Sequence, residues 1–77
     1  MNKLLFFAGL KDIINADHLE LNLAGKTVKE VKAELKQQYS DLPLESVLTA
    51  INEEFAFDDD IIEKNDVIAF IPPVSGG

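Results

Sequence analysis

The residues with the clearest chemical potential close the sequence, at Gly76 and Gly77. Neither has a Cβ, so the walls of another protein's active site can close around the backbone and the last carboxylate can be approached from any side. A carboxylate is a poor acylating group because its leaving group would be oxide. Acyl transfer there needs prior activation, for which adenylation by ATP is the usual route. The activated carbonyl could then accept sulfur and become a thiocarboxylate. We therefore expect Gly77 to be a reactive end to which one enzyme adds a group and from which another removes it.

Two prolines, Pro72 and Pro73, set the approach to this end. Proline lacks the N–H that a sheet ladder needs and has φ fixed at about −65°, so the chain is expected to leave a sheet there as a stiff extended arm. Extended, the segment from Pro72 to Gly77 spans roughly 20 Å, enough to enter another active site. The predicted recognition tail is Pro72, Pro73, Val74, Ser75, Gly76 and Gly77. The alternative is a frayed terminus or an expression scar, but such ends do not usually begin with two prolines directly after an apolar strand.

No other group in the sequence competes with this end. The absence of cysteine excludes disulfides, zinc thiolate sites and cysteine nucleophiles. Asp58, Asp59 and Asp60 are consecutive carboxylates without the alternating ligands of a calcium loop, so a solvated turn is expected there. The single histidine, His18, has no paired acid or nucleophile in view and is expected to be solvated. We therefore expect no metal and no bound cofactor.

The composition predicts one folded domain, residues 1–77, with an acidic surface. Seven lysines, no arginine and fourteen acidic residues give a net charge of −7, which would repel the phosphate backbone of a nucleic acid. The same charge suits solubility, and equally suits steering toward basic partner surfaces. Because no signal-peptide pattern or membrane-length apolar stretch is visible, we expect no membrane association and a cytoplasmic location.

Two nearly continuous apolar runs lie far apart in the chain, over residues 3–8 and 67–71. Each is too short for a helix of its own and does not alternate, which predicts a central strand covered on both faces. Further strands are expected over 18–23, 47–51 and 55–57, with turns over 9–17 and 52–54. The two apolar strands should therefore pair, with one hairpin on each flank.

One main helix is predicted between these strands. Thr27 followed by Glu30 matches the capping box, so the helix should begin at Val28. It is expected to fray near residues 39–40, before Pro43. Its apolar stripe is Val28, Val31 and Leu35.

A single helix across one face of such a sheet defines an α+β fold. The predicted architecture is the β-grasp, or ubiquitin-like fold, with a mixed sheet of about four to five strands and residues 72–77 as a projecting C-terminal tail.

Three segments together carry a resemblance to a known family. They are 70–77, reading Phe-Ile-Pro-Pro-Val-Ser-Gly-Gly, and the shorter 5–8 and 50–53. With them the whole chain resembles the small subunit of molybdopterin synthase, the sulfur carrier of molybdenum-cofactor biosynthesis. A Gly-Gly end alone is less specific, since thiamine sulfur carriers and ubiquitin share it.

The resemblance implies a reaction cycle at Gly77. An enzyme similar to ubiquitin-activating enzymes would adenylate it with ATP, and the adenylate would be converted to a thiocarboxylate. The tail would then enter the large synthase subunit and donate sulfur to cyclic pyranopterin monophosphate. The catalytic side chains would belong to that large subunit, and Gly77 would act as a consumable co-substrate.

The same resemblance indicates a docking surface. Its expected members are Phe7, Lys11, Phe70 and Ile71. Relatives often carry arginine at the position of Lys11 and an aromatic residue at that of Ile71, so the resemblance does not by itself imply bidentate ion pairing or aromatic packing at these two points. Because Phe6 and Phe7 point to opposite faces of one strand, one can be a core residue and the other a docking residue. The alternative is that both belong to the core.

Two other functions share the Gly-Gly end. One is a sulfur carrier of the thiamine type, which the Pro-Pro pair disfavours. The other is a ubiquitin-like protein modifier or plain interaction module, in which Gly77 would form an isopeptide bond with a target lysine or have no chemical role.

Overall fold

The computed structural model describes residues 1–7 and 9–72, so Ala8 and residues 73–77 lie outside the described part of the chain. The elements follow in the order β1 (Asn2–Phe6), α1 (Gly9–Ile14), β2 (His18–Leu21), α2 (Val28–Gln38), β3 (Leu48–Ile51), β4 (Glu54–Ala56) and β5 (Val67–Ile71). Neither described helix is long and apolar enough to cross a membrane.

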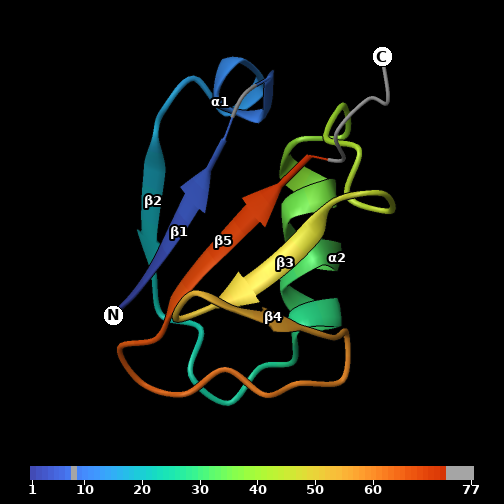
Figure 1. The fold of residues 1–77 in the computed structure, drawn as a ribbon. Helices are drawn as coiled ribbons and strands as arrows, with labels where there is room; N and C mark the ends of the chain where they lie inside the picture. Colours follow the sequence, from blue (N-terminus) through green and yellow to red (C-terminus); the bar gives the residue numbers. More distant parts are fainter. Residues whose placement is uncertain (8, 73–77) are drawn as a thin grey trace.

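The strands form one mixed sheet in the order β2-β1-β5-β3-β4 (Figure 1). β1 and β5 run parallel at its centre, with Leu4 opposite Ile68 and Phe6 opposite Phe70. The other three strand pairs are antiparallel. In Figure 1, α2 lies across one face of this sheet. The predicted β-grasp fold is confirmed, including the central pairing of the two apolar strands and the hairpin on each flank.

Helix α2 begins as its capping box predicts. The Thr27 N–H donates to the Glu30 carboxylate at 2.9 Å, and the Glu30 N–H donates to the Thr27 hydroxyl at 3.2 Å. The backbone hydrogen bond from Thr27, followed by the bond from its side chain, holds the pKa of Glu30 below its ordinary value. The buried stripe of the helix is the predicted one, Val28, Val31 and Leu35.

The core fills the space between α2 and the covered face of the sheet. Phe6 and Phe70 stack there with ring centroids 6.0 Å apart. Leu4, Ile68 and Leu42 are fully buried beside them. Burying a side chain of this size contributes about 1.5–3 kcal/mol, so the two central strands hold the body together through packing as well as hydrogen bonds.

Asn2 is a buried polar residue that ties three segments together. Its side-chain N–H groups donate to the backbone carbonyls of Glu63 at 2.8 Å and Asp66 at 3.0 Å. Its carbonyl oxygen accepts the N–H of Leu23 at 3.0 Å. The residue is only 1% exposed, so these bonds form away from competing water. The start of β1 is thereby fixed to the turn before β5 and to the loop after β2.

Residues 9–14 form the short helix α1, where the sequence predicted only a turn. Leu10 and Ile14, four positions apart, are buried on one side of it. A segment of six residues is too short for a helical period to be read from the sequence. The helix stops at Asn15, whose φ of +64° is one that asparagine tolerates.

The prediction that both apolar strands are covered on both faces is wrong. Leu5 on β1 and Val67, Ala69 and Ile71 on β5 remain partly exposed, and Phe7 is exposed. The single long helix can cover only one face, so the apolar residues on the other face remain open to solvent in the described structure.

Replacing Asn2 with alanine should lower the free energy of unfolding by roughly 2 kcal/mol, because it leaves the buried Leu23 N–H without an acceptor. Urea denaturation followed by circular dichroism measures this. Asn22, exposed and in the adjoining loop, provides the matched Asn22→Ala control, which should stay within about 0.5 kcal/mol of the parent. Equal losses in both variants would contradict the role assigned to Asn2.

Candidate functional site

The face of the sheet opposite α2 is the candidate site. Residues that oppose one another in neighbouring strands point to the same face. Leu5 opposes Ala69, Ala69 opposes Ala50, and Ala50 opposes Phe55. Lys3, opposite Val67, lies on the same face. The apolar residues of this surface, which we call the open face, are Leu5, Phe7, Leu48, Ala50, Phe55, Val67, Ala69 and Ile71.

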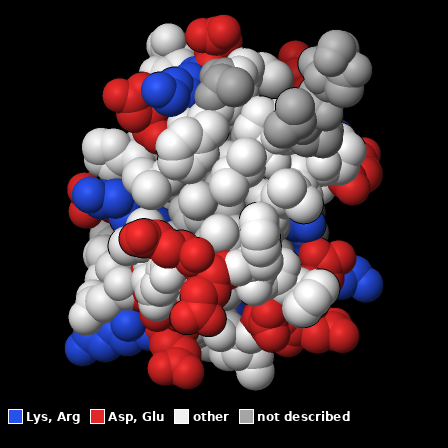
Figure 2. Space-filling model, in the orientation of Figure 1, with Lys and Arg blue, Asp and Glu red and all other residues white. Residues whose placement is uncertain are grey.

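The open face is apolar and hollowed. Residues of four strands and of the turn at 52–53 line a hollow of about 590 Å³ on it. Phe7 is 42% exposed, Leu48 is 49% exposed and Phe55 is 74% exposed. Figure 2 shows a wide uncharged surface in the middle of the molecule, bordered by acidic side chains along its lower edge. Large exposed apolar patches of this kind mark interaction sites in soluble proteins.

The predicted docking residues divide between surface and core. Phe7 and Ile71 line the hollow, as a docking surface requires. Phe70 is 0% exposed and packs in the core, so its assignment to the docking surface was wrong. The reason is the period of two along β5, which turns Phe70 to the side opposite Ile71.

Lys11 lies beside the open face and not in it. It is on α1, with its Nζ 3.8 Å from a carboxylate oxygen of Asp17, and it does not line the hollow. The predicted role of Lys11 in docking stays a prediction.

The open face ends where the predicted tail begins. β5 finishes at Ile71, which pairs with Leu48 of β3, and Pro72 is the next residue. The part of the predicted recognition tail formed by Pro73, Val74, Ser75, Gly76 and Gly77 lies outside the described residues. A partner seated on the open face would therefore contact the start of the tail at Pro72.

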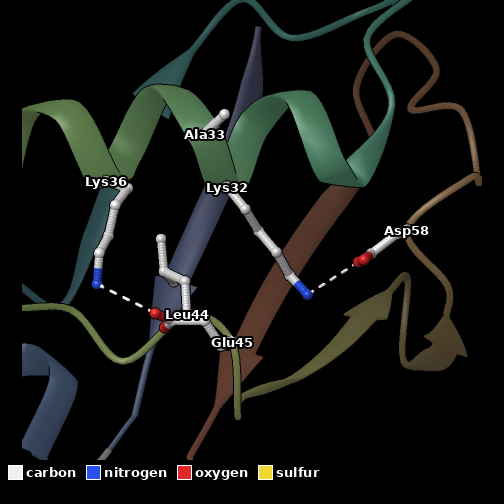
Figure 3. Close-up of a pocket in the computed structure, with 6 residues that line it drawn as sticks. All are labelled: Lys32, Ala33, Lys36, Leu44, Glu45 and Asp58. Carbon is white, nitrogen blue, oxygen red and sulfur yellow. Dashed lines mark hydrogen bonds and ion pairs between the residues drawn. The ribbon is translucent and has the colours of Figure 1, made fainter.

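A second hollow, of about 400 Å³, lies beside α2 (Figure 3). Lys32 pairs with Asp58 at 3.0 Å and Lys36 pairs with Glu45 at 3.6 Å. A hydrogen bond from its own backbone, followed by the charge of Lys36, holds the pKa of Glu45 below its ordinary value. Because both ammonium groups already have carboxylate partners, this hollow offers no uncompensated charge for an anionic ligand.

The acidic triplet and the histidine have local roles. Asp60 accepts the N–H of Phe57 at 2.7 Å, and the backbone carbonyls of Asp58 and Asp60 accept N–H groups from the first turn of α2. His18 begins β2 with its side chain 46% exposed. Across residues 1–7 and 9–72, no three His, Asp or Glu side chains converge as a metal site would require.

Of the open face, the sequence predicts only Phe7 and Ile71 as docking residues. Leu48 and Phe55 are among the members that it places in strands without assigning them to a surface. Their side depends on which residue of β3 faces which residue of β4, and a shift of one position would reverse it. The alternation of Leu48 with buried Thr49 was the available signal.

The strand order and the single helix across the sheet place the protein in the class of ubiquitin-like β-grasp proteins. Within that class the chain belongs to the ThiS family, whose model matches residues 4–77. It is 42% identical over 81 residues to the molybdopterin synthase sulfur carrier subunit of Dictyostelium discoideum, covering 97% of this chain and 94% of the relative. The subunit of the same name from Escherichia coli is 34% identical over 82 residues, with both chains fully covered.

Solved structures bear out the fold. A molybdopterin converting factor subunit 1 from Pyrococcus furiosus superposes with a TM-score of 0.84 at 24% identity, covering 95% of this chain and 97% of that one. Small archaeal modifier protein 1 from Methanosarcina acetivorans gives 0.83 at 24% identity, with 99% and 95% covered. The complex of subunits 1 and 2 of the Helicobacter pylori molybdopterin-converting factor gives 0.66 at 24% identity, with 99% and 97% covered.

The opposite roles of two adjacent phenylalanines can be tested by stability. Phe6→Ala should lower the free energy of unfolding by about 3–5 kcal/mol, because it leaves a cavity in the core. The matched change Phe7→Ala should cost less than about 1 kcal/mol, because that ring already contacts solvent. Urea denaturation of both variants would contradict the two-face assignment if the losses were similar.

Proposed function

We propose that this protein is a sulfur carrier of molybdopterin biosynthesis, with its cargo on the carboxylate of Gly77. The observation that carries the proposal is the open face ending at Pro72, four residues before a Gly-Gly pair. The relatives named molybdopterin synthase sulfur carrier subunit match nearly the whole chain, and the match to the ThiS family model extends to Gly77. A body with an apolar docking face and a bare glycine end suits a protein that is carried between enzymes.

The chemistry at Gly77 proceeds in two steps. The carboxylate attacks the α-phosphate of ATP in the activating enzyme, giving an acyl adenylate and releasing pyrophosphate. Sulfide then attacks the acyl carbon, and AMP leaves. The thiocarboxylate that results is a good nucleophile at neutral pH, so this chain needs no cysteine of its own.

Sulfur is delivered in the active site of a large synthase subunit. There the thiocarboxylate sulfur bonds to a carbon of cyclic pyranopterin monophosphate as an oxygen substituent leaves that carbon. Water then hydrolyses the resulting thioester, which leaves the sulfur on the pterin and restores the Gly77 carboxylate. The small size of Gly76 and Gly77 lets a narrow active site close around the backbone. Acid–base catalysis falls to the large subunit, because this chain supplies only the donor.

The large subunit docks on the open face in this proposal. The subunit 1 relative from Helicobacter pylori was solved in complex with its subunit 2. In this chain β5 is apolar on both sides although α2 covers only one, so a second protein is the natural cover for Phe7, Ala69 and Ile71. The adenylating enzyme would also dock on the open face beside Pro72. Lys11 would lie at the edge of the contact with the large subunit and of the contact with the adenylating enzyme. We place these ATP-dependent steps in the cytoplasm.

A protein modifier is the second candidate, favoured by the Methanosarcina acetivorans modifier protein among the structural neighbours. Its activated end would form an isopeptide bond with a target lysine in place of a bond to sulfur. A thiamine-type sulfur carrier would share the first two steps and differ in the acceptor. Both are outcomes of the first test below.

Incubation with the cognate activating enzyme, ATP and a sulfide source should add to the intact protein the mass difference between sulfur and oxygen. Tandem mass spectrometry should locate the change at Gly77. Gly76→Val, and a variant with one residue added after Gly77, should fold normally but gain no sulfur. Transfer to lysines with no thiocarboxylate would favour the modifier, and complementation of only a thiamine auxotroph would favour the thiamine pathway.

Docking on the open face can be tested by introducing one charged residue into it. Phe7→Asp should weaken binding to the cognate large subunit by roughly tenfold or more, because a carboxylate would be desolvated at the centre of an apolar contact. Isothermal titration calorimetry measures the affinity. Ile61→Asp is the matched control, since Ile61 is 62% exposed but does not line the hollow, and it should bind as the parent does. Parent-like binding by Phe7→Asp would contradict docking on this face.

A further inference from the structure

One residue that lines the hollow on the open face differs in chemical character from its surroundings. Glu53 lines the hollow, where every other lining residue is apolar except its neighbour Asn52. No lysine or histidine within residues 1–7 and 9–72 comes within 4.0 Å of its carboxylate. Glu53 is thus the one carboxylate among the described residues that line the hollow, and it has no cationic partner among them.

The backbone at this charge is in an unfavourable conformation. Asn52 and Glu53 form the turn between β3 and β4 with φ of +51° and +71°. Asparagine suits such a turn at its first position, and glycine is strongly preferred at the second. Glutamate has a Cβ that disfavours the left-handed region. Local chain geometry therefore does not account for glutamate at position 53.

The turn is nevertheless firmly held. The side chain of Asn52 accepts the N–H of Val67 at 2.9 Å and donates to the Asp66 carboxylate at 2.8 Å. The backbone N–H of Asn52 also donates to the carbonyl of Val67 at 2.8 Å. The carboxylate of Asp66 is occupied by this bond and by the N–H of Glu63, whereas that of Glu53 makes no hydrogen bond to the described residues. Of these two neighbouring acids, Asp66 serves the fold and Glu53 faces outward.

Glu53 and the start of the tail lie at opposite ends of β5. Val67, at the beginning of that strand, is bonded to Asn52, and Ile71, at its end, precedes Pro72. The four-residue separation along the strand corresponds to roughly 13 Å. A protein that covers the open face and also takes the tail is therefore held at one end by the tail and meets Glu53 at the other.

We infer that Glu53 is the orienting contact of the docking face, which pairs with a lysine or arginine of the large subunit and fixes the direction in which that subunit receives the tail. This inference rests on the proposed function. An apolar surface alone allows several rotations of a partner, because hydrophobic contact is not directional. A charge at one end discriminates among these rotations, since the wrong ones leave it desolvated without a partner. The strained glutamate is thereby explained as a binding residue.

A set of substitutions at position 53 separates charge from backbone strain. Binding to the cognate large subunit should follow charge: Glu53→Asp stays near the parent, Glu53→Gln and Glu53→Gly weaken by about threefold to fivefold, and Glu53→Lys weakens by about tenfold or more. Stability should follow the backbone: Glu53→Gly should raise the melting temperature by roughly 4 °C, and Glu53→Gln should leave it unchanged. Asp59→Asn, on an exposed loop outside the hollow, is the matched control for loss of one charge and should bind as the parent does.

Surface plasmon resonance at low and high ionic strength completes the test. The difference between parent and Glu53→Gln should shrink as salt rises, because the pair lies at the edge of the contact. If Glu53→Gln, Glu53→Gly and Glu53→Lys all bind like the parent at low salt, the inference is overturned while the sulfur-carrier proposal stands. If the parent itself does not bind the large subunit, the proposed function fails first.

Discussion

The parallel pairing of β1 with β5 is the constraint on which the rest of the molecule depends. A parallel pair needs a long crossover, and here nearly the whole chain supplies it. Because the two strands run in the same direction, Phe6 lies beside Phe70 in the core, and Phe7 and Ile71 follow on the opposite side of the sheet at the same end. The pairing therefore builds the hydrophobic core and also places Phe7 and Ile71, for which we propose a docking role, at the end of the sheet that leads to Pro72.

A chain of this length cannot cover both sides of such a sheet. With 77 residues and one long helix, it buries the side under α2 and leaves the open face to solvent. An uncovered apolar sheet face favours self-association, and a net charge of −7 opposes it through repulsion between copies. The acidic surface and the apolar face are thus complementary features, since the first keeps the second available to a partner.

The sequence predicted the elements that depend on local pattern or on strong burial. The capping box of Thr27 and Glu30, the stripe of α2 and the central strand pair were all read correctly. It did not predict α1, which has only two buried positions, or the side on which Phe70 points. An apolar run of five residues carries no alternation from which to assign faces, and cover by another protein looks the same in sequence as cover by the chain itself. The error about two-sided burial arose in this way, and the positive φ of Glu53 left no trace in the sequence either.

The chemistry proposed for Gly77 uses its main-chain carboxylate and no side chain. This restricts which parts of the protein can make its partners specific for it. Any chain ending in glycine offers the same carboxylate, so an activating enzyme or synthase cannot recognise its carrier by the reactive group alone. In the proposed mechanism, recognition therefore depends on the folded body. The apolar surface around Phe7 and Ile71 and the charge of Glu53 at its far margin are the features that we propose a partner recognises. A rigid sheet suits this task because its strands fix the spacing between these contacts and Pro72. In this proposal the fold identifies the carrier to its partners and sets the distance between their contacts and the tail. The catalytic groups then belong to the partners.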